Sequence, residues 1–258
     1  MVITSAQNPF VKKLALLLRD GRYRVEQKCL VLEGEKAVLD AISRGHICLN
    51  LVLSEDRNDV ASVESSFVHS AKPSAQTITH FSPDIFKKTS LMKQSTGVMG
   101  VFAIPEWNPA VWQHAKRQVA LLDAVQSPQN VGAIVRNAAA FGVEALLLLP
   151  GCADPTHPEV LRASSGYALD VPIFRCSPEA VTAVADRFCV LTLSATGAHC
   201  VGQERMPSPW LWVLGNEGRG PSWHVPQALS VRIPMMPGVE SLNVGVASGI
   251  CFYAGFSA

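Results

Sequence analysis

The C-terminal half of this chain alternates short apolar runs with segments of helical periodicity, and this alternation restricts the fold more than any other feature. The runs are apolar at consecutive positions, as in parallel strands that are covered on both faces of a sheet. Strand and helix in turn predict a doubly wound α/β sheet, whose ligands bind beyond the carboxyl ends of the strands. The expected strands are residues 119–125, 145–149, 190–193, 210–214 and 231–233, and the expected helices are residues 131–141, 178–188 and 242–256.

Residues 1–105 predict a separate, smaller α/β domain. Apolar residues between Phe10 and Leu18 are spaced for one face of a helix, with Ser5 as its expected cap. Short apolar runs that read as strands follow it, with one further helix between them. The expected strands are residues 29–32, 49–53, 77–81 and 100–104, and the further helix is residues 34–43.

The segment 104–118 separates these two patterns. Its prolines and its tryptophans, Trp107 and Trp112, lie between periodic stretches, which is typical of a linker or docking segment. We expect these tryptophans to pack the two domains together rather than to stack on bases. The predicted organisation is therefore a domain at 1–105, a linker at 106–118 and a domain at 119–258.

The composition excludes disordered and fibrous proteins, since 48% of the 258 residues are hydrophobic and 17% are charged. The formal net charge of +1 gives no basic field over the whole chain, so any contact with nucleic acid must be local. A basic cluster follows the polar side of the first expected helix. It is either a solvated helix face or a contact for an RNA backbone. The cluster consists of Lys12, Lys13, Arg19, Arg22, Arg24 and Lys28.

The cysteines and the N-terminus indicate the compartment. The seven cysteines are odd in number and scattered without a C-x-x-C pair, which predicts reduced thiols rather than a disulfide framework. Cys152 and His157 lack further ligands at zinc-like spacing, so we expect no metal site. The apolar run 14–18 is too short for a signal peptide or a membrane span. We expect a soluble cytoplasmic protein that does not bind membranes.

Polar or glycine-rich segments follow three of the C-terminal strands, and the first of them is residues 126–137. Arg136 lies within an otherwise apolar helix, so it should be paired or should face an anionic ligand. Asn130, at the start of that helix, has the residue type of a cap. A surface salt bridge for Arg136 and capping alone for Asn130 are the alternatives.

The second segment, residues 214–220, places three glycines around Glu217. Such a loop offers its own backbone amides and carbonyls as a contact surface. The glycine spacing is not that of a dinucleotide fingerprint, and Pro221 stands where a P-loop needs its lysine. A plain tight turn is the alternative.

The third segment, residues 233–248, runs from a strand end through a Pro/Gly loop to Ser241 and Asn243 at a helix start. Free backbone amides there, together with both side chains, suit a polar ligand. The alternative is a serine-capped helix that packs through its apolar residues, and the two readings do not exclude each other.

In this order the three segments resemble the motifs of the SpoU (TrmH-type) branch of the SPOUT methyltransferases, over roughly residues 119–256. The N-terminal part also resembles the small RNA-binding domain that many members of this family carry. The residues that carry the resemblance are Asn130-x-Gly132-x-x-x-Arg136, Leu214-Gly-Asn-Glu-Gly218, Ile233-Pro-Met235 and Ser241-Leu-Asn243, with Ile3-Thr-Ser-x-x-Asn-Pro-x-Val-Lys12 and Leu32-Glu-Gly34 in the N-terminal part.

This resemblance implies a C-terminal parallel-sheet α/β domain with a deep trefoil knot, a rare exception to the rule that folds are unknotted. It implies a homodimer through this domain, in which Arg136 of one chain completes the partner's site. The implied reaction moves a methyl group from S-adenosyl-methionine to a ribose 2′-hydroxyl in ribosomal or transfer RNA, with ribosomal RNA favoured by the two-domain layout. The implied cofactor-binding residues are Leu193, Ser194, Ala195, Leu214, Gly215, Asn216, Gly218, Ile233, Met235 and Leu242.

The chemistry of this reaction assigns roles to the polar residues. A sugar hydroxyl attacks a sulfonium methyl as it loses its proton, so the site needs a proton acceptor and an aligned substrate. Because a guanidinium has a pKa above about 12, we expect Arg136 to anchor a phosphate and polarise the oxygen rather than to accept the proton. The proton acceptor is then an RNA phosphate, a water or Glu217. Asn130, Glu217, Ser241 and Asn243 are expected to orient Arg136 and the ribose.

Two other function classes compete with this prediction. A non-catalytic RNA-binding protein that retains the methyltransferase fold is disfavoured, because every expected polar motif residue is present. A nucleotide-dependent oxidoreductase is disfavoured by the missing dinucleotide fingerprint. Residues 164–166, in the long loop after Pro150, resemble a family segment near the dimer and substrate face, and an ordinary surface loop is the alternative.

Overall fold

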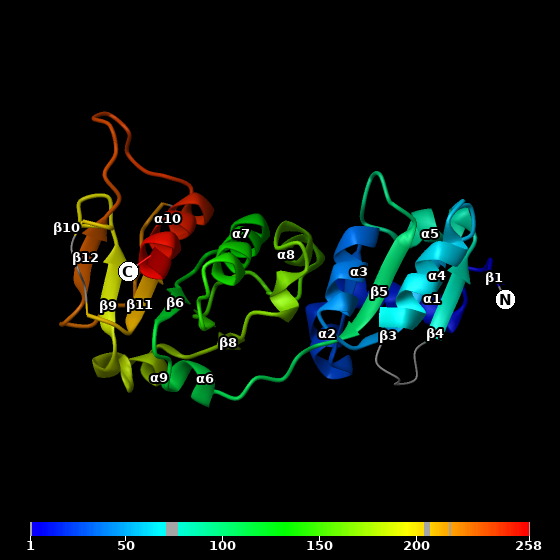
Figure 1. The fold of residues 1–258 in the computed structure, drawn as a ribbon, viewed down its shortest axis with the longest axis horizontal. Helices are drawn as coiled ribbons and strands as arrows, with labels where there is room; N and C mark the ends of the chain where they lie inside the picture. Colours follow the sequence, from blue (N-terminus) through cyan, green and yellow to red (C-terminus); the bar gives the residue numbers. More distant parts are fainter. Residues whose placement is uncertain (1, 71–76, 204–206, 217, 258) are drawn as a thin grey trace. The chain divides into compact units, whose positions relative to one another are not determined.

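The computed structural model describes residues 2–70, 77–203, 207–216 and 218–257, and the chain divides into two compact units. The first unit comprises Met1–Pro105 together with Thr156–Leu169, and the second comprises Glu106–Pro155 and Asp170–Ala258. Each unit has its own sheet (Figure 1). Within the described residues, no helix is long and apolar enough to cross a membrane.

The first unit is built on a mixed five-stranded sheet in the order β1-β4-β3-β5-β2. Strand β4 runs parallel to β1 and β3, whereas β5 runs antiparallel to β3 and β2. The strands are β1 (Val2–Ile3), β2 (Cys29–Glu33), β3 (Cys48–Ser54), β4 (Thr77–Phe81) and β5 (Val98–Ala103). The helices of this unit are α1 (Pro9–Arg19), α2 (Gly21–Gln27), α3 (Glu35–Ser43), α4 (Val60–Ser70), α5 (Pro83–Thr89) and α8 (Pro158–Ala163).

Alternation along β2 divides the core of the first unit between the two faces of its sheet. Cys29 and Val31 pack with residues of α1 and α5, whereas Leu30 and Leu32 pack with residues of α3, α4 and α8. Successive side chains of a strand point to opposite faces, so one apolar run supplies both halves of a helix–sheet–helix sandwich. Leu161 of α8 belongs to this core although its segment follows β7 of the second unit in the sequence.

Two predictions about the first helix are wrong. The N-cap of α1 is Asn8, whose Oδ1 accepts the backbone N–H of Phe10 at 2.8 Å, and Ser5 lies before it. Pro9 follows at the first helical position, where its fixed φ favours helix entry. Arg24 does not lie on a solvated face, because it is 2% exposed and donates from Nη1 to the Leu17 carbonyl and from Nε to Thr156 Oγ1.

The second unit contains a seven-stranded, all-parallel sheet in the order β10-β12-β9-β11-β6-β7-β8. The predicted α/β class and parallel sheet are thus confirmed. Its strands are β6 (Gln118–Leu122), β7 (Ala145–Leu148), β8 (Ile173–Arg175), β9 (Cys189–Leu193), β10 (His199–Cys200), β11 (Trp210–Leu214) and β12 (Leu229–Arg232). Its helices are α6 (Ala110–Gln113), α7 (Pro128–Ala140), α9 (Pro178–Thr182) and α10 (Val244–Ser257).

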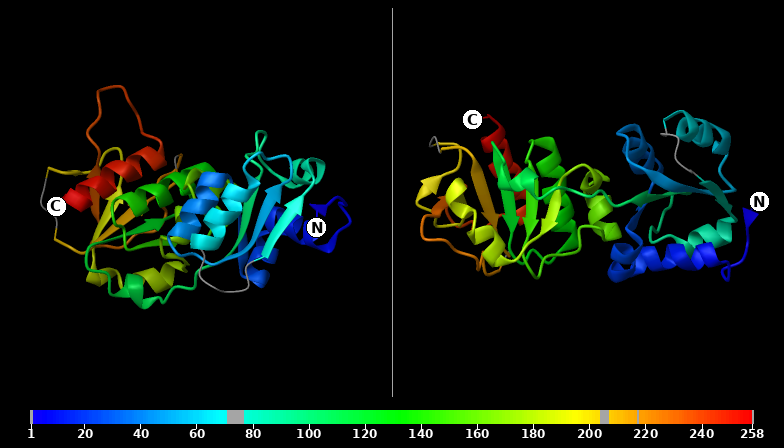
Figure 2. Two further views of the ribbon diagram at one scale, coloured as in Figure 1. Left: turned by 45° about the vertical axis from the view of Figure 1, so that its right-hand side comes forward. Right: turned by 90° about the horizontal axis from the view of Figure 1, so that it is seen from below.

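Helices α7 and α10 lie together against this sheet (Figure 2). Their backbones approach closely at Gly245, where an added Cβ would lie 2.9 Å from the Cβ of Ala133. Asn137 Nδ2 joins the two helices by donating to the Gly245 carbonyl at 2.7 Å and to Ser248 Oγ at 2.9 Å. The close contact between Ala133 and Gly245, together with the hydrogen bonds of Asn137, therefore fixes the position of the start of α10.

The opposite side of the sheet carries α9 and α6. The predicted helix over 178–188 is wrong in extent, because α9 ends at Thr182 and a separate 3-10 turn covers Ala185–Arg187. Trp112 of α6 is 4% exposed within the core of the second unit, so it packs inside one unit. Its docking role between domains, predicted above, is therefore wrong.

Candidate active site

A pocket of about 700 Å³ lies where β9, β11 and β12 end. Sites for small organic ligands commonly occupy several hundred Å³ at the carboxyl ends of parallel strands. Most of the predicted cofactor residues line this pocket: Leu193, Ser194, Ala195, Gly215, Asn216, Ile233, Met235 and Leu242. Leu214 is fully buried in β11 and Gly218 is exposed, and neither lines it.

Gly215 occupies a position that no other residue can fill. A Cβ built there would lie 2.6 Å from Pro221 Cα, and still closer to Gly220 C and Pro221 N. The chain after β11 therefore folds back on itself in backbone-to-backbone contact. The result is a loop that presents main-chain groups to the pocket, as the glycine spacing predicts.

Asn216 holds this loop in shape from within. Its Oδ1 accepts the Gly218 N–H at 2.9 Å, and its backbone carbonyl accepts the Gly220 N–H at 2.9 Å. Its Nδ2 donates to the Ala124 carbonyl at 3.3 Å, beyond the end of β6. Asn216 thus lines the pocket and also determines the course of the loop around it.

Asp123 is a site residue that sequence analysis missed. It follows β6, is 4% exposed, and its Oδ2 accepts the N–H and the hydroxyl of Ser222 at 2.5 and 2.8 Å and the Trp223 N–H at 2.7 Å. This buried carboxylate anchors the far end of the pocket loop to the neighbouring strand. An acid directly after an apolar run was the available signal, but its partners lie about 100 residues away in the sequence.

We predict that Asp123→Ala lowers the free energy of unfolding by about 2–3 kcal/mol, because it leaves buried backbone and hydroxyl donors without an acceptor. Urea denaturation monitored by tryptophan fluorescence measures this change. The matched control is Asp186→Ala, which removes an exposed carboxylate that accepts from Gln227 at 2.7 Å. Surface changes of this kind stay within about 0.5 kcal/mol, and an equal loss in both variants would contradict the anchoring role.

Two of the predicted polar residues, Asn130 and Asn243, meet at the adjoining ends of α7 and α10. Asn130 Oδ1 accepts the Nδ2 of Asn243 at 2.9 Å, so the first and third motifs are joined directly. Asn243 also caps α10, since its Oδ1 accepts the N–H groups of Gly245 at 2.9 Å and Val246 at 3.3 Å. The cap of α7 is Ser127, whose Oγ accepts the Asn130 N–H. Asn130 therefore does not cap α7, and the residue that caps α10 is Asn243 rather than a serine.

Arg136 is exposed on α7, and it makes no hydrogen bond or ion pair with any described residue. A surface salt bridge, the alternative considered for it, is not formed within the described chain. An exposed guanidinium whose donors are not used by any described residue is suited to an anionic group supplied from outside the chain.

Other polar groups reach the same pocket. Ser241 lines it, whereas Glu217 lies outside the described residues. Arg219, His224 and Glu240 also line the pocket, although no sequence motif singled them out. The pocket therefore combines apolar walls with both signs of charge.

The remaining candidates have structural roles. Cys152 donates its thiol hydrogen to the Leu122 carbonyl at 3.2 Å, and His157 Nδ1 accepts the Glu159 N–H at 3.2 Å as the cap of α8. Ser164 is fully buried and donates to the Leu161 carbonyl at the end of α8, so residues 164–166 are not an ordinary surface loop. All seven cysteines are free thiols, and burial raises the pKa of Cys251 to about 12, so this thiol stays protonated.

Comparisons with known proteins agree with this geometry. The SpoU rRNA Methylase family matches residues 117–253, and the MRM3-like substrate binding domain matches residues 8–100. An uncharacterized tRNA/rRNA methyltransferase of Synechocystis is 31% identical over 97% of this chain and 92% of that protein. The 23S rRNA (guanosine(2553)-2'-O)-methyltransferase RlmP of Bacillus subtilis is 27% identical over 97% of both chains.

Solved structures show the same fold. An rRNA methyltransferase from Sinorhizobium meliloti is 25% identical with a TM-score of 0.82, over 99% of this chain and 96% of that chain. The SpoU methyltransferase AviRb from Streptomyces viridochromogenes, in complex with AdoMet, has a TM-score of 0.85 at 21% identity, over 97% and 98%. The predicted resemblance is confirmed: the chain belongs to the SpoU rRNA methylase family of RNA methyltransferases and carries an MRM3-like substrate-binding domain ahead of its methylase domain.

Proposed function

We propose that this protein transfers a methyl group from S-adenosyl-methionine to a ribose 2′-hydroxyl of RNA, and that its substrate is ribosomal RNA. The observation that carries the proposal is the pocket of about 700 Å³, because segments after three different strands, including two of the three family motifs, form its wall. The first motif, which does not line the pocket, is tied to it through the Asn130–Asn243 hydrogen bond. The relatives named above are RNA methyltransferases, and RlmP acts on a ribose 2′-oxygen of 23S rRNA.

The pocket suits this cofactor. The backbone cradle at Gly215 receives a ligand edge without a side chain in the way, and Leu193, Ile233 and Leu242 offer apolar surface. When bound, S-adenosyl-methionine supplies an electrophilic methyl group on a sulfonium. Glu240 and Arg219 bring charges of both signs to the wall of the same pocket, which suits a ligand that carries both cationic and anionic groups.

Arg136 and the asparagine pair prepare the RNA for attack. The guanidinium of Arg136 binds a phosphate of the substrate and polarises the ribose oxygen. The Asn130–Asn243 bond fixes the start of α10, from which Ser241 reaches the pocket. The proton of the hydroxyl passes to an RNA phosphate, a water or Glu217.

The homodimer belongs to this proposal. Helix α10 exposes Val246, Ile250 and Tyr253, which are 55%, 39% and 58% exposed and lie on one helical face. A second copy of the chain is the occupant that the family assignment implies, and Arg136 of each chain would complete the partner's site. We predict that Val246→Glu converts a dimer into a monomer in size-exclusion chromatography with light scattering, with unchanged far-ultraviolet circular dichroism. A wild-type monomer would contradict the dimer.

The trefoil knot also remains a proposal. Strand β12 pairs with β10 and β9, whereas α10, the next helix, contacts β11 and α7, and this return towards the middle of the sheet supports a threaded path. The same segment, residues 233–242, forms one wall of the pocket. Knot and cofactor pocket would thus be built from the same residues.

The test is transfer of radiolabelled methyl to unmodified ribosomal RNA and to transfer RNA in separate reactions, followed by mapping of the labelled nucleotide. Label on a ribose of ribosomal RNA is expected. Label on transfer RNA alone would overturn the substrate assignment. Cofactor binding without transfer to either RNA would favour the non-catalytic alternative.

A further inference from the structure

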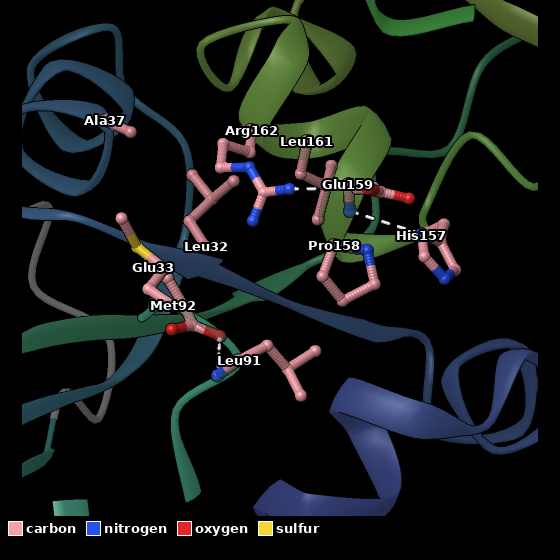
Figure 3. Close-up of a pocket in the computed structure, with 10 residues that line it drawn as sticks. All are labelled: Leu32, Glu33, Ala37, Leu91, Met92, His157, Pro158, Glu159, Leu161 and Arg162. Atoms are coloured by element: carbon pink, nitrogen blue, oxygen red, sulfur yellow. Dashed lines mark hydrogen bonds and ion pairs between the residues drawn. The ribbon is translucent and has the colours of Figure 1, made fainter. Parts of the chain in front are cut away.

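A second, smaller pocket lies in the first unit and shares no lining residue with the cofactor pocket (Figure 3). It encloses about 190 Å³, against about 700 Å³ for the cofactor pocket. One side comes from β2, α3 and the chain after α5, and the other comes from α8. A cavity of this size holds one ring system rather than a whole nucleotide or S-adenosyl-methionine.

The floor of this pocket is apolar and rigid. Leu32 and Leu161 line it from opposite elements, and each is 1% exposed within the same core cluster. Met92 and Pro158 line it further, and Leu91 lies at its edge with 42% of its surface exposed. Such walls offer flat apolar contact to a ring, and the exposed leucine gains burial when a ligand enters.

The polar groups of the pocket include acceptors held in fixed positions. The Glu33 carboxylate accepts the Ser90 hydroxyl at 2.6 Å and the Leu91 N–H at 3.1 Å, which orients it and leaves lone pairs for a ligand. Among the described residues, the only partner of the Glu159 carboxylate is Arg162 on the same helix, in a long 3.5 Å ion pair. Two carboxylates in so small a site repel phosphate, so the ligand is not an anion.

Donors stand beside these acceptors. Arg162 is 49% exposed at its side chain and retains most of its N–H groups for a ligand. His157 Nδ1 accepts the Glu159 N–H, and this bond places the proton of a neutral imidazole on Nε2. The pocket therefore recognises a neutral ring that carries both donors and acceptors on its edge.

We propose that this pocket binds one unstacked guanine base of the substrate RNA, an inference that rests on the proposed function. RNA is read in sequence through unpaired bases whose edges are hydrogen-bonded and whose faces meet side chains. Guanine presents two adjacent N–H donors, which a carboxylate accepts together, and O6 and N7 acceptors, which arginine donates to. One side of the pocket, from Leu32 to Met92, falls within the residues 8–100 that match the MRM3-like substrate binding domain, and the other side comes from the α8 segment of the same unit. With this pocket, the first unit recognises RNA sequence in addition to binding the RNA backbone.

The test uses the full chain and RNA hairpins whose loops contain uridines except for one central G, A or C, together with an all-uridine loop. Fluorescence anisotropy should show the G loop bound about tenfold more tightly, since a bidentate base contact contributes about 1–3 kcal/mol of discrimination. Glu159→Gln and the filling variant Ala37→Met should each reduce this preference to below about twofold. The slope of affinity against salt should not change, because no phosphate contact is lost.

Glu26→Gln is the matched control, because it removes an exposed carboxylate of the same unit outside the pocket, and it should keep the guanine preference. Equal binding of the four hairpins, or a preference that survives both pocket variants, would overturn the proposal. Methyl transfer by the wild-type chain is measured separately. If the protein methylates RNA but shows no preference for guanine, the proposed function stands and the guanine-binding proposal is overturned. If it prefers guanine but transfers no methyl group, the guanine-binding proposal stands and the proposed function is overturned.

Discussion

Replacing Arg136 with alanine is expected to lower the rate of methyl transfer by about 10²–10³-fold, while the affinity for S-adenosyl-methionine stays within about twofold. The magnitude is that of removing one group that stabilises charge in a transition state. Cofactor binding should be retained because Arg136 does not line the cofactor pocket. Folding should be retained because the side chain is exposed and makes no hydrogen bond or ion pair with a described residue that alanine would remove.

Single-turnover transfer to RNA and calorimetric titration of the cofactor measure the two quantities separately. Arg187→Ala is the matched control, because it removes another exposed arginine of the same unit. Arg136→Lys should recover only part of the rate, since an ammonium keeps the charge but not the two-pronged geometry. An Arg136→Ala protein with the wild-type rate would remove the central residue of the mechanism.

Replacing Gly215 with alanine is expected to weaken S-adenosyl-methionine binding at least 100-fold, or about 2.7 kcal/mol. The new Cβ would lie closer than contact distance to the backbone of Gly220 and Pro221, which cannot rotate away as a side chain can. The loop must then open, and the amides and carbonyls that it presents to the pocket move with it. The free energy of unfolding should also fall by about 1–3 kcal/mol, as for other overpacked sites.

Gly218→Ala is the control for this prediction, since it adds the same methyl group to the same loop. At Gly218 a Cβ meets only Asn216 Oδ1, at an ordinary 3.5 Å. Cofactor affinity should therefore change by less than about threefold, although Gly218 belongs to the second motif. Equal losses at both positions would show that the loop tolerates no side chain at all, and that close approach at Gly215 is not the cause.

The elements that sequence analysis predicted well are those whose periodicity is local. The buried runs of β6, β7, β9 and β11 are apolar at every position, because both faces of a parallel sheet are covered. The short edge strands β8 and β10 were missed, since two or three residues carry no period. The helix predicted over 178–188 breaks after Thr182, which no local pattern showed.

The site was predicted as far as its motifs reach, and not through its tertiary contacts. Gly215 and Ile233 line the pocket. Both could be predicted, because a glycine after a strand and a residue at a strand end are visible in the local sequence. Asp123 was missed because its role depends on hydrogen bonds to Ser222 and Trp223. Asn130 was predicted to cap its own helix, but its side chain accepts a hydrogen bond from Asn243 instead. A hydrogen bond between residues that are far apart in the sequence produces no local pattern from which it could be predicted.

The path of the chain between the units determines how fragments and chimaeras of this protein can be made. Thr156–Leu169 lies between β7 and β8 in the sequence but belongs to the first unit, so the backbone passes from one unit to the other three times. A fragment that ends at Pro105 would lack Leu161 and Leu169 from its core, and a fragment that begins at Glu106 would expose both. The first unit therefore cannot be separated from the second by a single cut in the chain. A chimaera that exchanges specificity with a relative must graft the inserted segment along with the N-terminal residues.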